Sequence, residues 1–461
     1  MNVPEEPTSQ HTPDSGQPTG HRTGAPEQPS PALSPPTATA DAPPGTPRAA
    51  PRPLRRARLA VTVLFFANAV GYANVVPRLP EIRDALGLSN AALGTAIAAM
   101  PAGALLAGLS AGALGARFGS GRLATTCAFG FALTVPLVGW ANGWWMLAGC
   151  LLLMGALDSV MDAAQNAHGL RVQRGYGRSI LNSFHGMWSL GAVSGGLLGT
   201  AAAGAGIPLH WHLAGTGVLL AVLGALAWPR LLPGSDEEIR SAADGQSDHA
   251  DDGRPAAAVR GGVRAAVPLL ALLGLMLVMA SVIEDTPASW GSALLQDEYA
   301  ATAAVGGLAY VAFQGAMTIG RFTGDRMTDR LGPVVVARWG GLLAAVPVAL
   351  ALLTDSGPAV IVAFGLAGLG AATLFPACFH AAGNIPGVRS GDGIAVVSWL
   401  ARVGFLVAPP LIGLIGDNAG LRPGTFVVVA AGLVVCLLAG VLSPRSLATP
   451  RSARTGGAAE R

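Results

Sequence analysis

The sequence predicts an all-α membrane protein with twelve transmembrane helices in two six-helix halves, and three observations support this prediction. Charged residues make up 12% of the 461 residues and hydrophobic residues 51%, whereas soluble domains carry about 25% charged residues. Twelve apolar stretches are each long enough to cross about 30 Å of hydrocarbon. A hydrophilic segment at 233–265 separates the sixth stretch from the seventh, so the stretches divide six and six.

The expected spans follow one another with short loops inside each half. Those of the first half are 59–77, 91–114, 122–140, 144–166, 180–203 and 213–232, and those of the second are 266–286, 303–323, 334–354, 358–380, 392–416 and 424–443. We therefore assign 56–232 to an N-terminal half and 266–443 to a C-terminal half.

The segments outside the halves are not expected to fold. Residues 1–55 are rich in Pro, Thr and Ala and poor in large apolar residues, a composition that cannot offset the entropy of ordering. The segment 233–265 is expected to be a flexible linker, and 444–461 a second tail. Neither tail nor linker is expected to form a signalling domain.

Arginine placement predicts the orientation in the membrane. All 29 Lys+Arg residues are arginines, and 25 of them fall in the two tails, the linker and the loops on one side. Only Arg78, Arg83 and Arg422 fall in loops of the other side, and Arg402 lies within a span. By the positive-inside rule, both termini are cytoplasmic and the protein is a multi-pass protein of the cytoplasmic (inner, plasma) membrane.

Several functional classes are disfavoured. There is no Walker motif, nucleophile elbow or metal-ligand spacing, so we expect no enzyme, no metal and no cofactor. The four cysteines lie in apolar runs without CxxC spacing and are expected to pack in the bundle. No basic patch is interleaved with aromatic residues, so nucleic acid is not an expected partner. The expected partners are the lipid bilayer, protons and a small-molecule solute, bound by a monomer.

Acidic residues interrupt the fourth span. Asp158, Asp162, Gln165 and Asn166 fall within roughly a quarter of a helix circumference, so they form one polar stripe. Because a charge at bilayer depth costs at least about 2.5–3.5 kcal/mol, this stripe should face a bundle interior or a watery cavity. Asp158 and Asp162 are therefore candidates for proton coupling, although hydrogen bonds to neighbouring helices would also explain them.

Two further polar groups are cavity candidates. On the fifth span, Asn182, His185 and Trp188 share one helix face. His185 suits solute binding or proton relay, or equally a hydrogen bond to a facing helix. The remaining solute-contact candidates are Asn68 on the first span, Gln314 on the eighth and Trp399 on the eleventh.

Glu284 and Arg402 are the charged candidates of the second half. Glu284 is preferred over the adjacent Asp285, because the two point about 100° apart and at most one faces a given cavity wall. A guanidinium within a span must meet a carboxylate, backbone carbonyls or an anionic solute. For Arg402, the expected partner is Glu284 or a cavity aspartate, and a role in coupling or solute binding is equally open.

A repeated loop links the two halves. Gly112-Ala-Leu-Gly-Ala-Arg117-Phe-Gly119 follows the second span, and Asp325-Arg-Met-Thr-Asp329-Arg330-Leu-Gly332 follows the eighth. Both copies end in Arg-x-Gly, as expected of an internal repeat. Arg122 lies three residues beyond the first copy.

This loop pattern resembles G-x-x-x-D-R-x-G of the major facilitator superfamily, and 59–443 is similar to its members. The first copy departs from the pattern in having Ala116 where Asp is usual, and the second has Asp325 at the leading Gly. The segments MDAAQNAHG, GRSILNSFHGMWSLG, GRFTGDRMTDRLG and APPLIGLIGD resemble the fucose-permease-like branch, in particular its MosC/YbjJ-like group. The resemblance implies two six-helix halves that work by alternating access, and a gating role for the repeated loop motif together with Arg122. It also implies an acidic residue followed by a tryptophan, here Trp290, lining the cavity.

We therefore expect a secondary transporter, a symporter that is proton-coupled and moves a small polar solute such as a sugar. One alternative is proton-antiport efflux of a metabolite or drug, which the scarcity of aromatic cavity residues mildly disfavours. A second alternative is a non-transporting membrane sensor built on the same fold.

Overall fold

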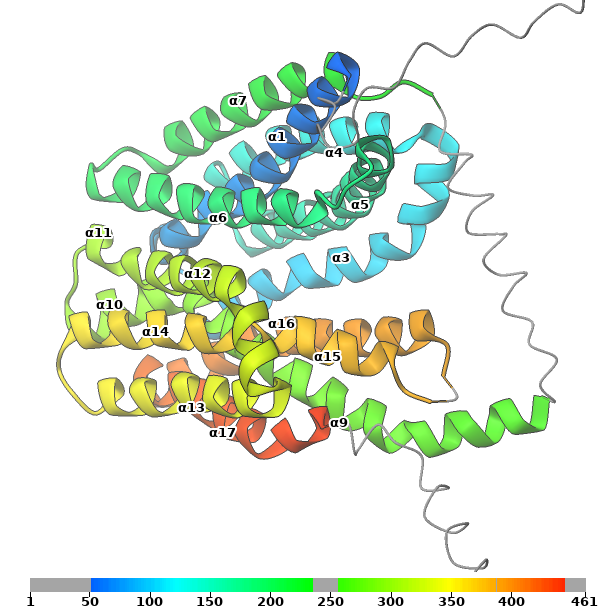
Figure 1. The fold of residues 1–461 in the computed structure, drawn as a ribbon. Helices are drawn as coiled ribbons and strands as arrows, with labels where there is room; N and C mark the ends of the chain where they lie inside the picture. The colour runs from blue at the N-terminus through cyan, green and yellow to red at the C-terminus, as the bar shows by residue number, and fades with distance from the viewer. Residues whose placement is uncertain (1–50, 235–255, 387, 444–461) are drawn as a thin grey trace, which may run out of the picture. The chain divides into compact units, whose positions relative to one another are not determined.

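A computed structural model of the protein describes residues 51–234, 256–386 and 388–443, and every regular element in these ranges is helical (Figure 1). The N-terminal half contains α1 (Arg52–Val75), η1 (Val76–Arg78), α2 (Leu79–Ala85), α3 (Asn90–Phe118), α4 (Ser120–Gly139), α5 (Trp144–Tyr176), α6 (Leu181–Gly204), α7 (Leu209–Ala227) and η2 (Trp228–Arg230). The C-terminal half contains α9 (Ala256–Ser289), α10 (Gly291–Tyr299), α11 (Ala303–Gly306), α12 (Leu308–Leu331), α13 (Pro333–Leu352), α14 (Gly357–Ala371), α15 (Leu374–Gly383), α16 (Ser390–Ala419), α17 (Leu421–Leu438) and η3 (Ala439–Leu442).

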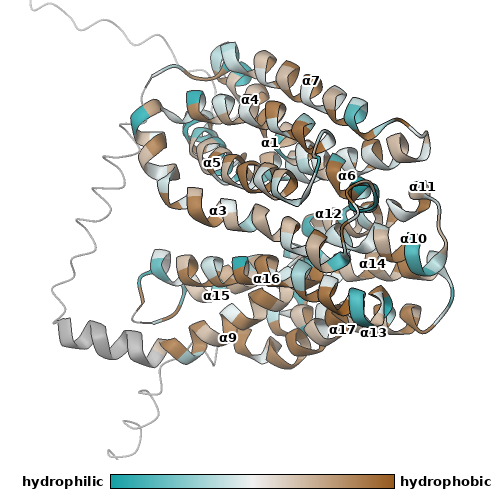
Figure 2. Ribbon diagram, turned by 180° about the vertical axis from the view of Figure 1, so that it is seen from behind, coloured by the Kyte–Doolittle hydropathy of each residue, from teal (hydrophilic) through white to brown (hydrophobic). Residues whose placement is uncertain are grey.

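The predicted fold class is confirmed. Among the described residues, 11 helical segments are long and apolar enough to cross a membrane, and Figure 2 shows hydrophobic residues along most of the helices. The expected span at 180–203 forms α6, 24 residues long, which is not among the 11. Glycine, serine and threonine residues recur along the whole of α6 and lower its hydropathy, so the count of twelve spans stays a prediction.

The structure differs from the expected spans mainly at helix ends. Helix α5 runs to Tyr176 and α9 begins at Ala256, ten residues inside the expected linker. The short helices α2 and α10 were not expected, since each is too short and too polar to register as a span. Most of the N-terminal tail, the middle of the linker and the C-terminal tail lie outside the described residues.

Large apolar side chains are exposed on the outside of the bundle. Trp145 is 84% exposed, Leu437 80% and Leu353 75%. An extensive apolar surface of this kind is unfavourable in water but suits contact with lipid chains. The surface therefore agrees with the multi-pass fold.

Close packing of α1 on α6 depends on small residues. A Cβ at Gly191, Gly195 or Gly199 would lie 2.4 Å, 2.8 Å and 2.6 Å from a backbone carbonyl oxygen of α1. The spacing of four residues places these glycines on one face of α6 and permits the close approach of α1. The seam brings the polar side chains of α1 and α6 into hydrogen-bonding range.

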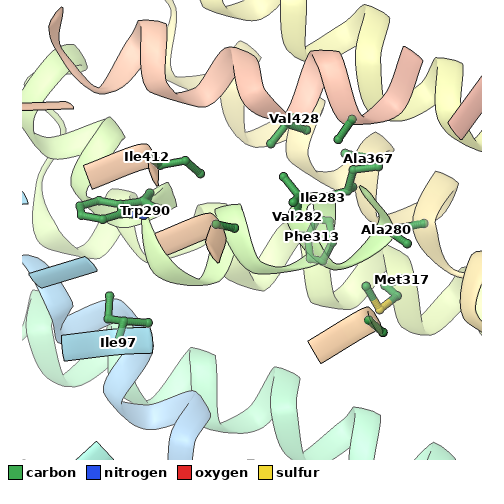
Figure 3. Close-up of a cluster of buried hydrophobic side chains, with 14 of the residues drawn as sticks. Ile97, Ala280, Val282, Ile283, Trp290, Phe313, Met317, Ala367, Ile412 and Val428 are labelled. Carbon is green, nitrogen blue, oxygen red and sulfur yellow. The ribbon is translucent and has the colours of Figure 1, made fainter. Parts of the chain in front are cut away.

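The two halves touch backbone to backbone where α3 meets α16. A Cβ at Gly94 would lie 2.4 Å from the carbonyl oxygen of Pro409, and a Cβ at Gly413 would lie 2.4 Å from that of Asn90. Both positions thus require glycine. Beside this contact, Trp290 of the C-terminal half is completely buried near Ile412 (Figure 3).

The repeated loop has the same backbone conformation in both halves. Gly119 joins α3 to α4 at φ 81° and ψ 141°, and Gly332 joins α12 to α13 at φ 81° and ψ 153°. A positive φ of this size is readily adopted only by glycine. This requirement explains why both copies of the motif end in that residue.

Two ends of the bundle are distinguished below. The closed end carries α2, α10 and the first residues of α3. The linker end carries Gly119, Gly332 and the start of the linker at Pro233.

Candidate functional site

A line of hydrogen bonds joins three helices of the N-terminal half. The Asn68 side chain on α1 donates through Nδ2 to Oδ1 of Asp158 on α5, at 2.7 Å. The Trp188 indole on α6 donates through Nε1 to Oδ1 of Asn68, at 2.9 Å. Asn68 is only 3% exposed, so its amide is committed to these two partners.

The line continues into the C-terminal half through an arginine. The guanidinium carbon of Arg321 on α12 lies 5.9 Å from the centre of the Trp188 ring, in cation–π range. Nη2 of the same arginine lies 3.7 Å from Oε1 of Glu284 on α9. Glu284 is half-buried, with 20% of its side chain exposed.

The other polar residues of α5 interact mainly within their own helix. Oδ1 of Asp162 accepts from Nδ2 of Asn166 at 3.0 Å and from Nε2 of Gln165 at 3.4 Å. Asp162 is exposed, whereas Gln165 is completely buried and its Oε1 has no hydrogen-bond partner. The polar stripe predicted on the fourth span is therefore exposed at Asp162 and buried at Gln165.

Arg402 reaches toward the N-terminal half from α16. It is half-buried, and a Cβ at Gly108 of α3 would lie 3.9 Å from its Nη1. It acts electrostatically on both Asp158 and Asp162. Within the part of the chain that the structure describes, it makes no hydrogen bond or ion pair at contact distance. The expected pairing with Glu284 is not formed, and Arg321 lies beside that carboxylate at 3.7 Å.

The remaining candidates are less connected. His185 is exposed and lies edge-on to Phe65 at 5.2 Å, while Asn182 and Trp399 are exposed. Gln314 is 4% exposed, and its Nε2 has no partner.

The resemblance implied a cavity-lining tryptophan at position 290, and this expectation is wrong. Trp290 is completely buried in the core at the closed end. Asp285 accepts a hydrogen bond from Ser289 at 3.0 Å within α9, so it is separate from the line that includes Glu284.

Hydrogen bonds between the halves gather at the closed end. Arg83 donates to both carboxylate oxygens of Asp297, at 2.5 Å and 3.0 Å. The carboxylate of Asp417 accepts from the backbone N–H groups of Asn90 and Ala91, at 2.8 Å and 2.9 Å. The Ser292 hydroxyl donates to the carbonyl oxygen of a residue in η1 at 3.3 Å. Each of these hydrogen bonds ties one half to the other.

The linker end is not tied in this way. Exposed residues of the two loop motifs include Gly112, Arg117, Arg122, Asp325, Asp329 and Arg330. Arg117 lies over the ring of Phe118 at 5.3 Å. In the described ranges, the acidic and basic residues of the second copy form no ion pair. The arrangement is thus closed by hydrogen bonds at one end only.

Two arginines were misjudged from the sequence. Arg321 was counted with the arginines of a loop, yet it lies in α12 beside Glu284 and Trp188. Arg78 was counted with an outside loop, yet it is 1% exposed and donates to Glu81 at 2.6 Å and to the carbonyl of Ile207 at 2.8 Å. The signal for Arg321 was its position inside the apolar run 303–323.

The described residues contain no group of three or more His, Cys, Asp or Glu side chains that could hold a metal ion. The chemistry they offer is hydrogen bonding, ion pairing and reversible protonation of carboxyl groups. An interface between two helical halves that carries acids, amides and a guanidinium group without an ion-pair partner can bind a polar molecule and exchange protons.

The fold and this interface define a membrane transporter built from two related halves. The sequence profile of the Major Facilitator Superfamily matches residues 61–288 and 273–460, and the chain belongs to this family. Its members are transporters of small solutes and not enzymes.

Relatives of similar length support the family assignment. The chain is 29% identical over 380 residues to the uncharacterized transporter y4wD of Sinorhizobium fredii, covering 82% of this chain and 96% of the relative. It is also 29% identical over 380 residues to the membrane protein MosC of Rhizobium meliloti, covering 82% and 88% of the two chains. A finer branch of the family is only suggested by these matches.

Solved transporters share the fold. The nucleoside transporter NupG matches with a TM-score of 0.65 at 12% identity, covering 84% of this chain and 98% of that one. The D-xylose–proton symporter matches with a TM-score of 0.66 at 13% identity, covering 85% and 97%.

Proposed function

We propose that the protein is a secondary active transporter that couples proton movement to transport of a small polar solute, such as a sugar, by alternating access. The observation that carries this proposal is the line of contacts from Asp158 through Asn68 and Trp188 to Arg321 and Glu284. It places a carboxyl of each half at the interface between the halves, where a solute site lies in a transporter of this architecture.

Asp158, Asp162 and Glu284 are the proposed proton-binding groups. Because Asp158 accepts a short hydrogen bond from a buried amide, its charge is held in a defined place and its protonation changes that bond. Glu284 plays the corresponding part in the C-terminal half, where protonation would release Arg321.

The proposed solute contacts surround these acids. They are Asn68, Gln165, Asn166, Asn182, His185, Trp188, Gln314, Trp399 and Arg402. Gln165 and Gln314 each have a buried polar atom without a partner. Such an atom costs about 1–3 kcal/mol, so a solute hydroxyl that reaches it would be bound favourably. Arg402 offers further donors to a solute rich in oxygen.

We further propose that the linker end faces the cytoplasm, in the cytoplasmic membrane, and that the protein works as a monomer. The arginine distribution supports this orientation. The hydrogen bonds at the closed end then hold the outer side shut, and the structure corresponds to an inward-facing state. The loop motif around Gly119 and Gly332, with Arg117 and Asp329, would tie the linker end in the outward-facing state.

Proton flux in sealed proteoliposomes tests this function. The wild-type protein is compared with Asp158→Asn, while sugars, polyols and nucleosides are added outside and the internal pH is followed with a trapped dye. We expect one solute class to drive proton movement in the wild type and to lose that effect in Asp158→Asn. Asp355→Asn serves as a matched control, because this acid is 93% exposed outside the spanning helices.

Two results would count against the proposal. Solute-driven proton flux that persists in Asp158→Asn would remove this acid from coupling. No flux with any polar solute, in protein shown to be folded, would favour efflux of an apolar compound or a non-transporting role.

A further inference from the structure

We propose that Asn68, Trp188 and Arg321 form a relay that couples the charge of Asp158 in the N-terminal half to the Glu284 ion pair in the C-terminal half. These three residues are called the relay below. The inference deepens the proposed function, on which it rests in taking Asp158 as a group that gains and loses a proton.

The first step of the argument is the orientation of the Asn68 amide. An indole N–H can only donate, and an ionised carboxylate can only accept. Asn68 meets both demands with its oxygen toward Trp188 at 2.9 Å and its nitrogen toward Asp158 at 2.7 Å. Ionised Asp158 therefore fixes the amide in the one orientation that also holds the indole.

Protonation of Asp158 weakens this arrangement. The hydrogen bond to a carboxylate is charge-assisted and roughly twice as strong as one between neutral groups. A protonated carboxyl also gains an O–H donor, which competes for the Asn68 oxygen that Trp188 uses. The indole is then held less firmly, although nothing has touched it directly.

The second step lies between the halves. Arg321 has one neighbour from each half. The ring of Trp188 from the N-terminal half lies 5.9 Å away, and the carboxylate of Glu284 from the C-terminal half lies 3.7 Å away. At 3.7 Å, Arg321 and Glu284 form an ion pair without a hydrogen bond. The guanidinium therefore interacts with both the Trp188 ring and the Glu284 carboxylate. When the Trp188 ring is no longer held by Asn68, Arg321 can move from the ring toward Glu284 and form a closer ion pair. The protonation state of Asp158 in one half then affects the Glu284 ion pair in the other half.

Other charged groups also face these acids. Asp162 and Arg402 act on Asp158, and His185 acts on Asp162. Asp285 and Tyr310 lie near Glu284 and Tyr72 lies near Asp285. These groups act through space and stay in place in every variant below, so a comparison of variants separates their influence from that of the relay.

A double-mutant cycle on carboxyl protonation tests the relay without any solute. Purified full-length protein in lipid nanodiscs is titrated with pH while infrared difference spectra record the protonated carboxyl band, which Asp158→Asn assigns. The midpoint for Asp158 is measured with and without Glu284→Gln, in the wild-type background and in Trp188→Phe. Phenylalanine retains a ring for Arg321 but removes the N–H that binds Asn68.

In the wild-type background, Glu284→Gln should shift the Asp158 midpoint by about half a pH unit or more, a size set by one cation–π contact. In Trp188→Phe, the shift should fall to about 0.2 unit or less. Trp339→Phe is the matched control, because this tryptophan is 63% exposed on α13 and the shift should persist there.

Equal shifts in the wild-type and Trp188→Phe backgrounds would overturn the relay, and so would the absence of any Asp158 titration. If Trp188→Phe does not fold, Asn68→Leu breaks both hydrogen bonds with a side chain of similar size and should abolish the coupling in the same way. Intact coupling without solute-driven flux would refute the transport proposal alone, whereas flux without coupling would refute the relay alone.

Discussion

Removing the carboxylate of Asp417 should favour opening of the closed end. Asp417 belongs to α16 of the C-terminal half, yet its two oxygens accept the backbone N–H groups of Asn90 and Ala91, the first residues of α3. These N–H groups have no partner within their own helix, because the first turn of a helix lacks acceptors. The carboxylate of Asp417 in the C-terminal half thus supplies the hydrogen-bond acceptors that the first N–H groups of α3 lack within their own helix.

The size of the effect follows from this geometry. A side-chain acceptor at a helix N-terminus is worth about 0.5–2 kcal/mol, and a negative charge there adds about 0.3–1 kcal/mol. Asp417 is exposed, so water recovers part of both contributions when the carboxylate is lost. We expect Asp417→Ala to shift the equilibrium by about 1 kcal/mol, which is about a fivefold change in the ratio of open to closed molecules. Asp417→Asn should have a smaller effect in the same direction.

Spin labels across the closed end provide the assay. Cysteines at Ala85 and Thr302, both exposed, place one label in each half. Of the native cysteines, Cys436 is partly accessible and is replaced by alanine, while the other three are buried. Pulsed electron–electron distance measurements in nanodiscs then report the share of molecules in which the labels are far apart.

The neighbouring residue provides the control. Asn418 is also exposed, but its amide bonds to the carbonyl of Leu414 in its own helix, at 2.8 Å. Asn418→Ala should therefore leave the distance distribution unchanged. The reasoning is refuted if Asp417→Ala behaves like the wild type, or if Asn418→Ala shifts the distribution as much.

Other changes should be equally specific. Arg83→Gln should raise the same long-distance population about threefold, since the bidentate pair is partly exposed, and Arg83→Asp combined with Asp297→Arg should restore the wild-type distribution. Gly413→Val should lower the thermal unfolding midpoint, measured by differential scanning fluorimetry, because its side chain would collide with backbone of α3; Gly413→Ala should lower it less. Arg78→Met should cost about 1 kcal/mol of stability, because it removes the hydrogen bonds from this buried guanidinium to Glu81 and to the carbonyl of Ile207. A chemical denaturation midpoint equal to that of the wild type would contradict this assignment.

Sequence periodicity and hydropathy located the helices well, because a spanning helix is a local property of about 20 residues. Prediction from periodicity and hydropathy failed where a helix is short or only weakly hydrophobic. Helix α6 falls below the hydropathy of the other spans because glycine, serine and threonine residues recur along it. Helix α10 is too short to be distinguished from a loop. Helix ends such as Tyr176 lie beyond the apolar run, where no membrane constraint acts on composition.

The site was less accessible to sequence reasoning, because charge partners are set by tertiary structure. An acid in the fourth span and an asparagine in the first were both identified, but nothing local shows that Asp158 and Asn68 share a hydrogen bond. Arg402 was expected to pair with Glu284 or a cavity aspartate, whereas Arg321 lies beside Glu284. A count of arginines by loop misplaced Arg321, because α12 continues to Leu331 and Arg321 lies well inside it.

The backbone contact between Gly94 and Pro409 lies close to the start of α3, so a tilt of the helix about this contact would move its two ends by unequal distances. The helix extends about 36 Å from Gly94 to Phe118 at the linker end, but only about 6 Å from Gly94 to Asn90 at the closed end. A tilt of about 10° about Gly94 would therefore move Phe118 by about 6 Å and Asn90 by about 1 Å. One ångström is enough to break a hydrogen bond of 2.8 Å. A motion that carries the linker end of α3 by more than one turn's rise would therefore need only about 1 Å of movement at Asn90, enough to break its hydrogen bond to Asp417.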